Sequence, residues 1–228
     1  MKDITLYMPD FATVRLIECS PPSWMVQIAL EEKGIDYDLR LLSFAAGEHK
    51  SPEMLARNPR GTVPVLGHGG VSVYETFAIL EYLEYAYPNP ALLPESRQLR
   101  ALALTRLHES SNLKTVGMSL FRYLMTTRAS ALEHSAIDEL ALQLHDELFF
   151  WEHYYGISSW AVGSSLTLAD LSVFTYLATA VHLGLVLDEQ RYPHLRRFYE
   201  TMRARPSVEG SWPERWSRDY TFLAEANA

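Results

Sequence analysis

The chain has 228 residues, a formal net charge of −8 at pH 7 and a single cysteine, Cys19. This length suffices to bury one large core or two small ones, and the acidic balance without any Lys/Arg run leaves no basic face for a phosphate backbone, so we expect no nucleic-acid partner. One cysteine excludes an intramolecular disulfide and a CxxC metal knuckle, and it fits a reducing cytosol.

The N-terminal residues, MKDITLYMPD, carry acids where a signal peptide would have an apolar core. No stretch approaches the roughly 18 consecutive apolar residues that a membrane helix requires. We therefore expect a cytoplasmic protein with no membrane partner.

The first ninety or so residues alternate strand-like runs with helical runs, which favours βαβ construction and a mostly parallel sheet. The first strand is either residues 4–8 or residues 14–18, and the pattern does not decide between them. Apolar residues at i,i+4 spacing predict a helix over residues 24–33, which Gly34 ends.

The same alternation continues to residue 87. Apolar and polar residues alternate over 37–41, which predicts a strand, and Ser51-Pro52 opens a short helix that must end by Asn58-Pro59. The stretch VPVLGHGGVSVYE predicts two strands joined by a glycine turn, and residues 75–87 return to helical spacing.

A proline-rich stretch without periodicity, YPNPALLPES, then separates two regions of different character. We predict a first domain over residues 1–88, a linker over 89–96 and a second domain over 97–228. The second domain is expected to be all helical, with long helices over four ranges: 97–126, 130–155, 167–184 and 192–204.

Candidate chemistry begins at Ser20-Pro21-Pro22-Ser23, where the first strand leads into the first helix. Backbone N–H groups at a helix start point toward whatever binds there. The same residues also fit an ordinary N-cap serine followed by prolines in the first turn.

Two further junctions carry groups that suit a peptide ligand. At Glu75-Thr76 the amides and the threonine hydroxyl suit a carboxylate and the glutamate suits an ammonium, although an acidic first helical turn is common. Thr62-Val63-Pro64 precedes a strand, so a cis proline there would present the Val63 backbone to an extended peptide, or it is a plain loop proline.

Five stretches taken in order resemble cytosolic glutathione transferases. They are CSPPSWMVQIALEEKGIDYD, GEHKSPEMLARNPRGTVPVL, VYETFAILEYL, SLTLADLSVFTYLA and YPHLRRFYETMRARPS. The first stretch resembles the serine motif of the phi and tau classes and also the zeta class, whereas GEHKSPEML is more similar to the delta and theta classes. The resemblance implies an α/β thioredoxin-like N-terminal domain, an all-α C-terminal helical domain, and a homodimer.

The resemblance also implies how glutathione binds, as a co-substrate and without a metal. Ser20 would donate a hydrogen bond to the glutathione sulfur, and Glu75 and Thr76 would hold the γ-glutamyl end. The other implied contacts are those of Val63 beside a cis Pro64 with the cysteinyl unit, and of His49, Lys50 and Thr62 with the glycine carboxylate, where Thr62 replaces a lysine typical of the theta class.

This chemistry is energetically feasible. Lowering a thiol pKa from about 8.5 by about two units requires roughly 2.7 kcal/mol that favours the thiolate. A charge-assisted hydrogen bond supplies about 1.5 to 3 kcal/mol and a helix N-terminus about 0.3 to 1 kcal/mol. We therefore expect a transferase whose thiolate attacks a small hydrophobic electrophile by conjugation, dehalogenation or isomerisation.

Two other functions remain open at this point. A non-catalytic binding module would use the same fold. A thiol redox enzyme would need a nucleophilic cysteine at position 20, and Cys19 points to the opposite face of an extended backbone. The helical histidines lack HExxH spacing, so we expect no metal site.

We expect Thr167 and Asp170 to form a capping box at the start of a buried helix. An ordinary capping box and the corresponding family motif both stabilise the start of a helix, so we expect a structural role for this pair.

Overall fold

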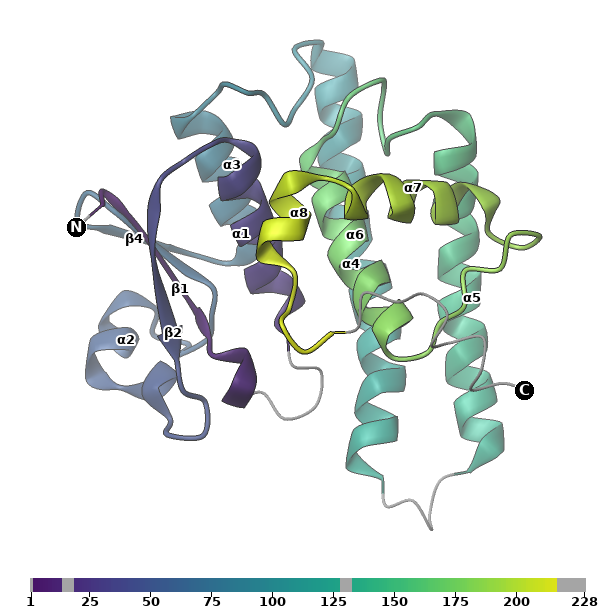
Figure 1. Cartoon of the computed structure of the whole chain (residues 1–228), viewed down its shortest axis with the longest axis horizontal. Coiled ribbons are helices and arrows are strands. Elements are labelled where there is room, and N and C mark those ends of the chain that lie inside the picture. Colours follow the sequence, from purple (N-terminus) through teal and green to yellow (C-terminus); the bar gives the residue numbers. More distant parts are fainter. Residues whose placement is uncertain (1, 14–18, 128–132, 217–228) are drawn as a thin grey trace. The chain divides into compact units, whose positions relative to one another are not determined.

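The computed structural model describes residues 2–13, 19–127 and 133–216 (Figure 1). Its contacts divide the chain into two compact units. The first unit combines Met1–Leu92 with Ala204–Trp216, and the second contains Leu93–Arg203. Each unit is considered by itself below.

A four-stranded sheet of order β2-β1-β3-β4 forms the centre of the first unit. Its strands are β1 (Ile4–Pro9), β2 (Tyr37–Leu42), β3 (Val65–His68) and β4 (Val71–Tyr74). Residues 4–8 therefore belong to the first strand, whereas the alternative, residues 14–18, lies outside the described residues.

The prediction of a mostly parallel sheet was wrong. Only β1 and β2 are parallel, while β1 pairs with β3 and β3 with β4 in antiparallel fashion. The reason is that the Gly69-Gly70 turn between β3 and β4 is too short for a parallel crossover, and β3 enters the sheet against β1. The β1–helix–β2 unit alone follows the βαβ rule.

Three helices accompany the strands as predicted: α1 (Pro21–Glu32), α2 (Pro52–Arg57) and α3 (Thr76–Ala86). Helix α1 buries Trp24, Met25 and Ile28 and packs on α3. Gly34 ends α1 with a φ of 61°, a left-handed conformation that a side chain would disfavour.

Helix α8 (Pro206–Ser211) also belongs to the first unit and lies beside α1 (Figure 1). The Arg205 guanidinium donates two hydrogen bonds to Glu32, with N···O distances of 2.6 and 2.7 Å. The Trp24 indole N–H donates to Ser211 Oγ at 2.9 Å. The sequence pattern did not predict α8, because it is short and held by contacts from distant residues.

Residues 87–96 form no helix or strand. The buried Lys33 ammonium at the end of α1 fixes the start of this segment by donating to the Tyr87 and Pro90 carbonyls at 2.8 and 2.9 Å. It also pairs with Glu84 at 2.6 Å, which satisfies the charge of a lysine that has no solvent contact.

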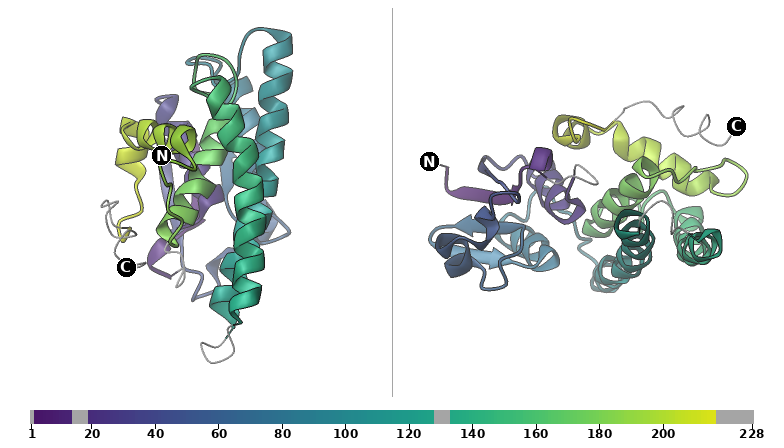
Figure 2. Two further views of the ribbon diagram at one scale, coloured as in Figure 1. Left: turned by 90° about the vertical axis from the view of Figure 1, so that its right-hand side faces the viewer. Right: turned by 90° about the horizontal axis from the view of Figure 1, so that it is seen from below.

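In the described residues of the second unit every regular element is a helix, as predicted. Helices α4 and α5 run side by side (Figure 2), and the nearly wholly buried α6 packs on α4. The four helices are α4 (Arg97–Thr126), α5 (His134–Ile157), α6 (Leu168–His182) and α7 (Pro193–Arg203).

The predicted capping box at the start of α6 is confirmed. Thr167 accepts from the backbone of Asp170, and Asp170 accepts from the Thr167 backbone. Among the described helices, none is long and apolar enough to cross a bilayer.

Candidate functional site

Several of the predicted site residues lie at one edge of the sheet, the end at which β1 finishes. Tyr7 pairs with Val65, and Val65 pairs with Tyr74. Pro64, directly before Val65, and Glu75, directly after Tyr74, therefore lie at this edge. In a βαβ unit the helix begins at the carboxyl end of its first strand, which places the start of α1 at the same edge.

Ser20 is the N-cap of α1, with an extended backbone (φ −131°, ψ 95°). Its carbonyl accepts the Trp24 N–H at 2.8 Å, but its side chain makes no cap hydrogen bond. The Ser20 hydroxyl instead donates to Ser23 Oγ at 3.0 Å. Because Pro21 and Pro22 occupy the first two helical positions, this helix start offers fewer N–H groups than an ordinary one.

Cys19 is wholly buried, and this burial raises the pKa of its thiol. A hydrogen bond from the Ser20 backbone lowers the pKa but does not offset the burial. A buried thiol of raised pKa is neither ionised at neutral pH nor accessible, so the geometry disfavours a redox function for Cys19.

The Val63-Pro64 peptide bond is cis, one of the two conformations that the sequence left open. The buried Asn58 fixes the loop before it: its amide donates to the Thr62 carbonyl at 2.8 Å and to Thr62 Oγ1 at 3.0 Å. The Thr62 hydroxyl is therefore held by its own loop. Sequence reasoning missed Asn58, although an asparagine directly before a loop proline is a signal for such a bond.

Glu75 has a φ of 69°, the only positive φ outside glycine among the described residues. Such a conformation is costly for a residue with a Cβ and concentrates at functional sites. Its carboxylate is 67% exposed and lies 4.0 Å from Nε of Arg60. Thr76 follows as the first residue of α3.

His49 and Lys50 lie in the 3₁₀ turn η2 (Glu48–Lys50). The His49 ring packs against Phe44 with centroids 4.1 Å apart and the ring planes tilted by 30°. Desolvation, with a smaller effect of the Lys50 charge, lowers the pKa of His49. The Lys50 ammonium donates to the Arg60 carbonyl at 2.9 Å. His49 is therefore a neutral imidazole at neutral pH.

Some of the predicted residues are linked by contacts, whereas others share only their position at the same end of the sheet. The Lys50 ammonium bonds the backbone carbonyl of Arg60, and the Arg60 guanidinium lies 4.0 Å from the Glu75 carboxylate, so Arg60 links these two predicted residues. In the described contacts Ser20 pairs with Ser23, not with another predicted residue. Arg60 is a neighbour of Glu75 and Lys50 that the sequence did not single out, whereas Ser23 belongs to the stretch that it did.

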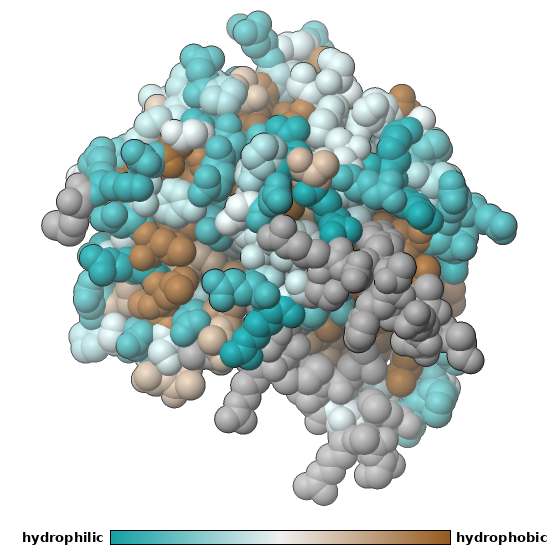
Figure 3. All heavy atoms as spheres, in the orientation of Figure 1, coloured by the Kyte–Doolittle hydropathy of each residue, from teal (hydrophilic) through white to brown (hydrophobic). Residues whose placement is uncertain are grey.

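A separate cavity of about 250 Å³ in the first unit contains none of the predicted site residues. Its lining combines the apolar surface over β2, visible in Figure 3, with the segment after α8. The apolar members include Met8, Leu39, Leu41 and Trp212.

Comparison with known proteins identifies the family of the chain. Residues 19–86 match the N-terminal domain of glutathione S-transferases, and residues 119–210 match their C-terminal domain. Glutathione S-transferase A of Pleuronectes platessa is 36% identical over 86% of this chain and 89% of its own length. The chain belongs to the glutathione S-transferase family. It is an enzyme of that family, with a thioredoxin-like N-terminal domain and a helical C-terminal domain.

Other relatives include a protein with a different name and two solved structures. Maleylacetoacetate isomerase of Pseudomonas aeruginosa is 31% identical over 85% of this chain and 92% of its own. The crystal structure of a glutathione S-transferase from the Antarctic clam Laternula elliptica has a TM-score of 0.84 at 33% identity and covers 97% of this chain and 98% of its own. A glutathione transferase of Phanerochaete chrysosporium, solved with oxidized glutathione, has a TM-score of 0.80 at 26% identity, covering 94% and 96%.

Proposed function

We propose that this chain binds glutathione and stabilises its thiolate through a hydrogen bond from Ser20, so that the sulfur attacks a small hydrophobic electrophile. The observation that carries the proposal is the Ser20 hydroxyl at the start of α1, which makes no cap bond to its own helix. A hydroxyl that is not needed for capping is available to a ligand. The reaction is conjugation, dehalogenation or a glutathione-dependent isomerisation.

The remaining contacts hold the tripeptide in an extended form along the sheet edge. The cis Val63-Pro64 bond directs the Val63 backbone toward the cysteinyl unit, where N–H and C=O can pair with it as an added strand. Glu75 is exposed and faces the γ-glutamyl ammonium, and Thr76 at the start of α3 binds the adjacent carboxylate.

The carboxylate of the glycine unit binds to His49 and Lys50 at the same edge of the sheet. His49 binds as a neutral donor and Lys50 as a cation, while the Thr62 hydroxyl, already bonded to Asn58, contributes less. This local excess of basic groups contrasts with the net charge of −8 for the chain and suits a ligand with two carboxylates.

The thiolate then depends mainly on Ser20. Lowering the thiol pKa by about two units needs roughly 2.7 kcal/mol, of which a charge-assisted hydrogen bond supplies about 1.5 to 3 kcal/mol. Two prolines at the helix start reduce the amide contribution, so the hydroxyl supplies most of the stabilisation. No general base is required, because the proton leaves to solvent before the attack.

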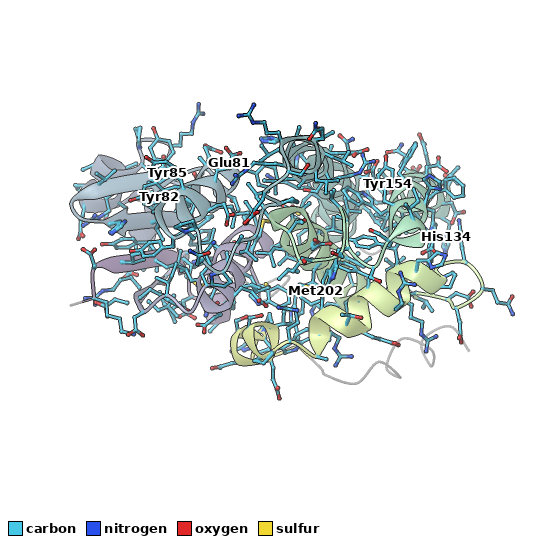
Figure 4. All side chains as sticks on the ribbon, turned by 90° about the horizontal axis from the view of Figure 1, so that it is seen from above. Glu81, Tyr82, Tyr85, His134, Tyr154 and Met202 are labelled. Carbon is cyan, nitrogen blue, oxygen red and sulfur yellow. The ribbon has the colours of Figure 1, made fainter. Side chains whose placement is uncertain are left out.

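A homodimer is the expected assembly, with the first domain of one subunit against the second domain of the other. Apolar side chains lie exposed on both units, such as Tyr85 on α3 at 87% exposure and Leu102 on α4. Tyr85 lies with Glu81 and Tyr82 on α3 (Figure 4). Sedimentation of the Tyr85→Glu and Leu102→Glu variants tests this assembly, and a purely monomeric wild type would refute it.

The mechanism is tested by titrating the ultraviolet absorbance of the thiolate in the complex with glutathione. Wild type should show the thiolate band at neutral pH, Ser20→Ala should bind glutathione without it, and Cys19→Ser should behave as wild type. A band that persists in Ser20→Ala contradicts the role of Ser20. Activity lost only in Cys19→Ser would support the redox alternative, and binding without any band would support a binding module.

A further inference from the structure

We infer that Ser23 is a positioning residue whose hydroxyl donates to Ser20 Oγ while Ser20 donates to the glutathione sulfur. This inference rests on the proposed role of Ser20 and extends it by one residue. Ser23 Oγ lies 3.0 Å from Ser20 Oγ, and Ser23 is 0% exposed. Nothing in the family match or in the sequence motif assigns a role to this hydroxyl.

The number of hydrogens on the two hydroxyls limits the bonds that they can make. A serine hydroxyl donates one hydrogen and accepts up to two. In the structure the Ser20 hydroxyl donates its hydrogen to Ser23 Oγ. When a thiolate binds, that hydrogen must turn to the sulfur, and the bond between the two serines survives only if Ser23 becomes the donor.

No proton leaves either serine in this step. The thiol proton goes to solvent, Ser20 donates its hydrogen to the sulfur, and Ser23 donates its hydrogen to Ser20 Oγ. Hydrogen bonds in such a chain polarise one another, so a donor behind Ser20 makes Ser20 a better donor to the thiolate. The two hydroxyls therefore act as a short relay of hydrogen bonds.

Pro21 and Pro22 explain why a side chain, and not a backbone amide, is the proposed donor to Ser20 Oγ. An N-cap oxygen ordinarily accepts from the backbone N–H of the second or third helical residue. Here the second residue is Pro22, which has no N–H, and Ser20 makes no cap bond with the third. Ser23 Oγ accepts from Ser20 in the structure, and with glutathione bound the Ser23 hydroxyl would supply the donor that an amide usually provides.

The neighbourhood of Ser23 keeps this donor in place. Trp24 follows it and is wholly buried between Trp212 and Trp216, with ring centroids at 5.5 and 5.6 Å, while its N–H is held by Ser211. These contacts fix the first turn of α1. A fixed donor loses little conformational entropy when it turns toward Ser20.

An opposite role is conceivable on the same geometry and predicts the opposite result. If Ser23 only held the Ser20 hydrogen away from the sulfur, its removal would free Ser20 and lower the pKa of bound glutathione. The sign of the pKa change on removing the Ser23 hydroxyl therefore decides between the two roles.

The experiment is a pH titration of the thiolate absorbance of bound glutathione in Ser23→Ala and Ser23→Thr. Ser23→Ala should raise the pKa of the bound thiol by about half a unit, and kcat/KM below that pKa should fall about threefold but converge with wild type at higher pH. Affinity for S-methylglutathione, which cannot ionise, should not change. Ser23→Thr, which keeps a hydroxyl, should restore the wild-type pKa.

Ser110→Ala is the matched control, because Ser110 and Ser172 form another buried pair of hydroxyls, 2.5 Å apart, in the second unit. It should lose comparable stability without any shift in the thiol pKa. Should Ser23→Ala fold poorly, the pH–rate profile of Ser23→Cys, of similar size and weaker hydrogen bonding, gives the same direction of shift.

A double variant separates this inference from the proposed function. Adding Ser23→Ala to Ser20→Ala should change the thiol pKa no further. An equal rise in both backgrounds, or an unchanged or lower pKa in Ser23→Ala alone, overturns the relay while leaving Ser20 in place. A bound thiol pKa that Ser20→Ala itself does not raise overturns both.

Discussion

The starts of helices α1 and α6 are built from similar residues and are used in opposite ways. Helix α1 begins at Ser20, whose side chain makes no cap bond, and helix α6 begins at Thr167, whose side chain and backbone take part in a closed capping box. Both starts carry a hydroxyl at the N-cap. The difference is whether the polar groups are satisfied within the fold.

At the start of α6 both carboxylate oxygens of Asp170 accept hydrogen bonds. The carboxylate of the wholly buried Asp170 accepts four hydrogen bonds, from Tyr155 and Ala161 at one oxygen and from the backbone and hydroxyl of Thr167 at the other. Burial raises the pKa of Asp170 to about 6, and these hydrogen bonds only partly offset it. This helix start can serve stability alone, because it leaves no group for a ligand.

At α1, within the part of the chain that the structure describes, the Ser20 hydroxyl is bonded to another hydroxyl and to no other group, and prolines replace half of the usual amide donors. Such a start stabilises its helix weakly. If Ser20 binds the glutathione sulfur as proposed, the start of α1 gives up capping energy for that role, and variants at the two starts should separate stability from activity.

The largest expected effect is on stability at α6. Asp170→Ala leaves four buried donors without an acceptor and should lower the free energy of unfolding by about 3 to 5 kcal/mol. Chemical denaturation measures this loss, and the exposed Asp138→Ala serves as a control with little change. A loss below about 1 kcal/mol would mean that water replaces the carboxylate.

The next effect is on activity at α1. Ser20→Ala should lower kcat/KM at pH 7 by about 10- to 100-fold, because a charge-assisted hydrogen bond to the thiolate is lost. Steady-state kinetics with glutathione and a halogenated aromatic electrophile measure it. Ser96→Ala, which removes a serine N-cap from α4, is the control and should keep full activity. Equal losses in both variants would contradict the distinction between the two starts.

A smaller effect concerns pH and stability. An acid whose pKa is higher in the folded protein than in the unfolded chain is destabilised by its ionisation, so stability is lost as the pH rises from 3.8 through about 6. Lowering the pH from 7 to 5 should therefore recover about 1 kcal/mol in wild type relative to Asp170→Asn. Parallel pH profiles of the two proteins would contradict the raised pKa.

Much of this architecture could be predicted from local sequence signals. The helical spacing after Ser20, the glycine turn before β4 and the Thr167–Asp170 box each act within a few residues, and the structure confirms all three. Local signals do not encode strand direction, and the sheet was therefore predicted with too many parallel pairs.

The features that sequence reasoning missed depend on distant residues. Helix α8 is held by Glu32 and Trp24, more than 170 positions earlier in the chain, and its own six residues have no periodicity. The left-handed backbone of Glu75 likewise has no signal in its side chain. The junctions at Ser20, Val63-Pro64 and Glu75-Thr76 were singled out by local patterns, and the resemblance added their roles. The neighbours Asn58 and Arg60 required the structure.

The smallest expected effect compares two serine caps within the first unit. Ser20 and Ser51 are both N-caps followed by proline, but Ser51 Oγ accepts the Met54 N–H at 3.3 Å whereas Ser20 Oγ accepts no such bond. Ser51→Ala should therefore cost about 1 kcal/mol of unfolding free energy, and Ser20→Ala about half as much.

Denaturant titrations of the two variants at one pH measure this difference, provided that their m-values agree. Because both serines precede a proline at the first helical position, the helix propensity of the next residue cancels between them. Equal losses would mean that Ser20 caps α1 in solution, and its hydroxyl would then be committed to the helix before glutathione arrives. A smaller loss at Ser20 leaves that hydroxyl available to the sulfur.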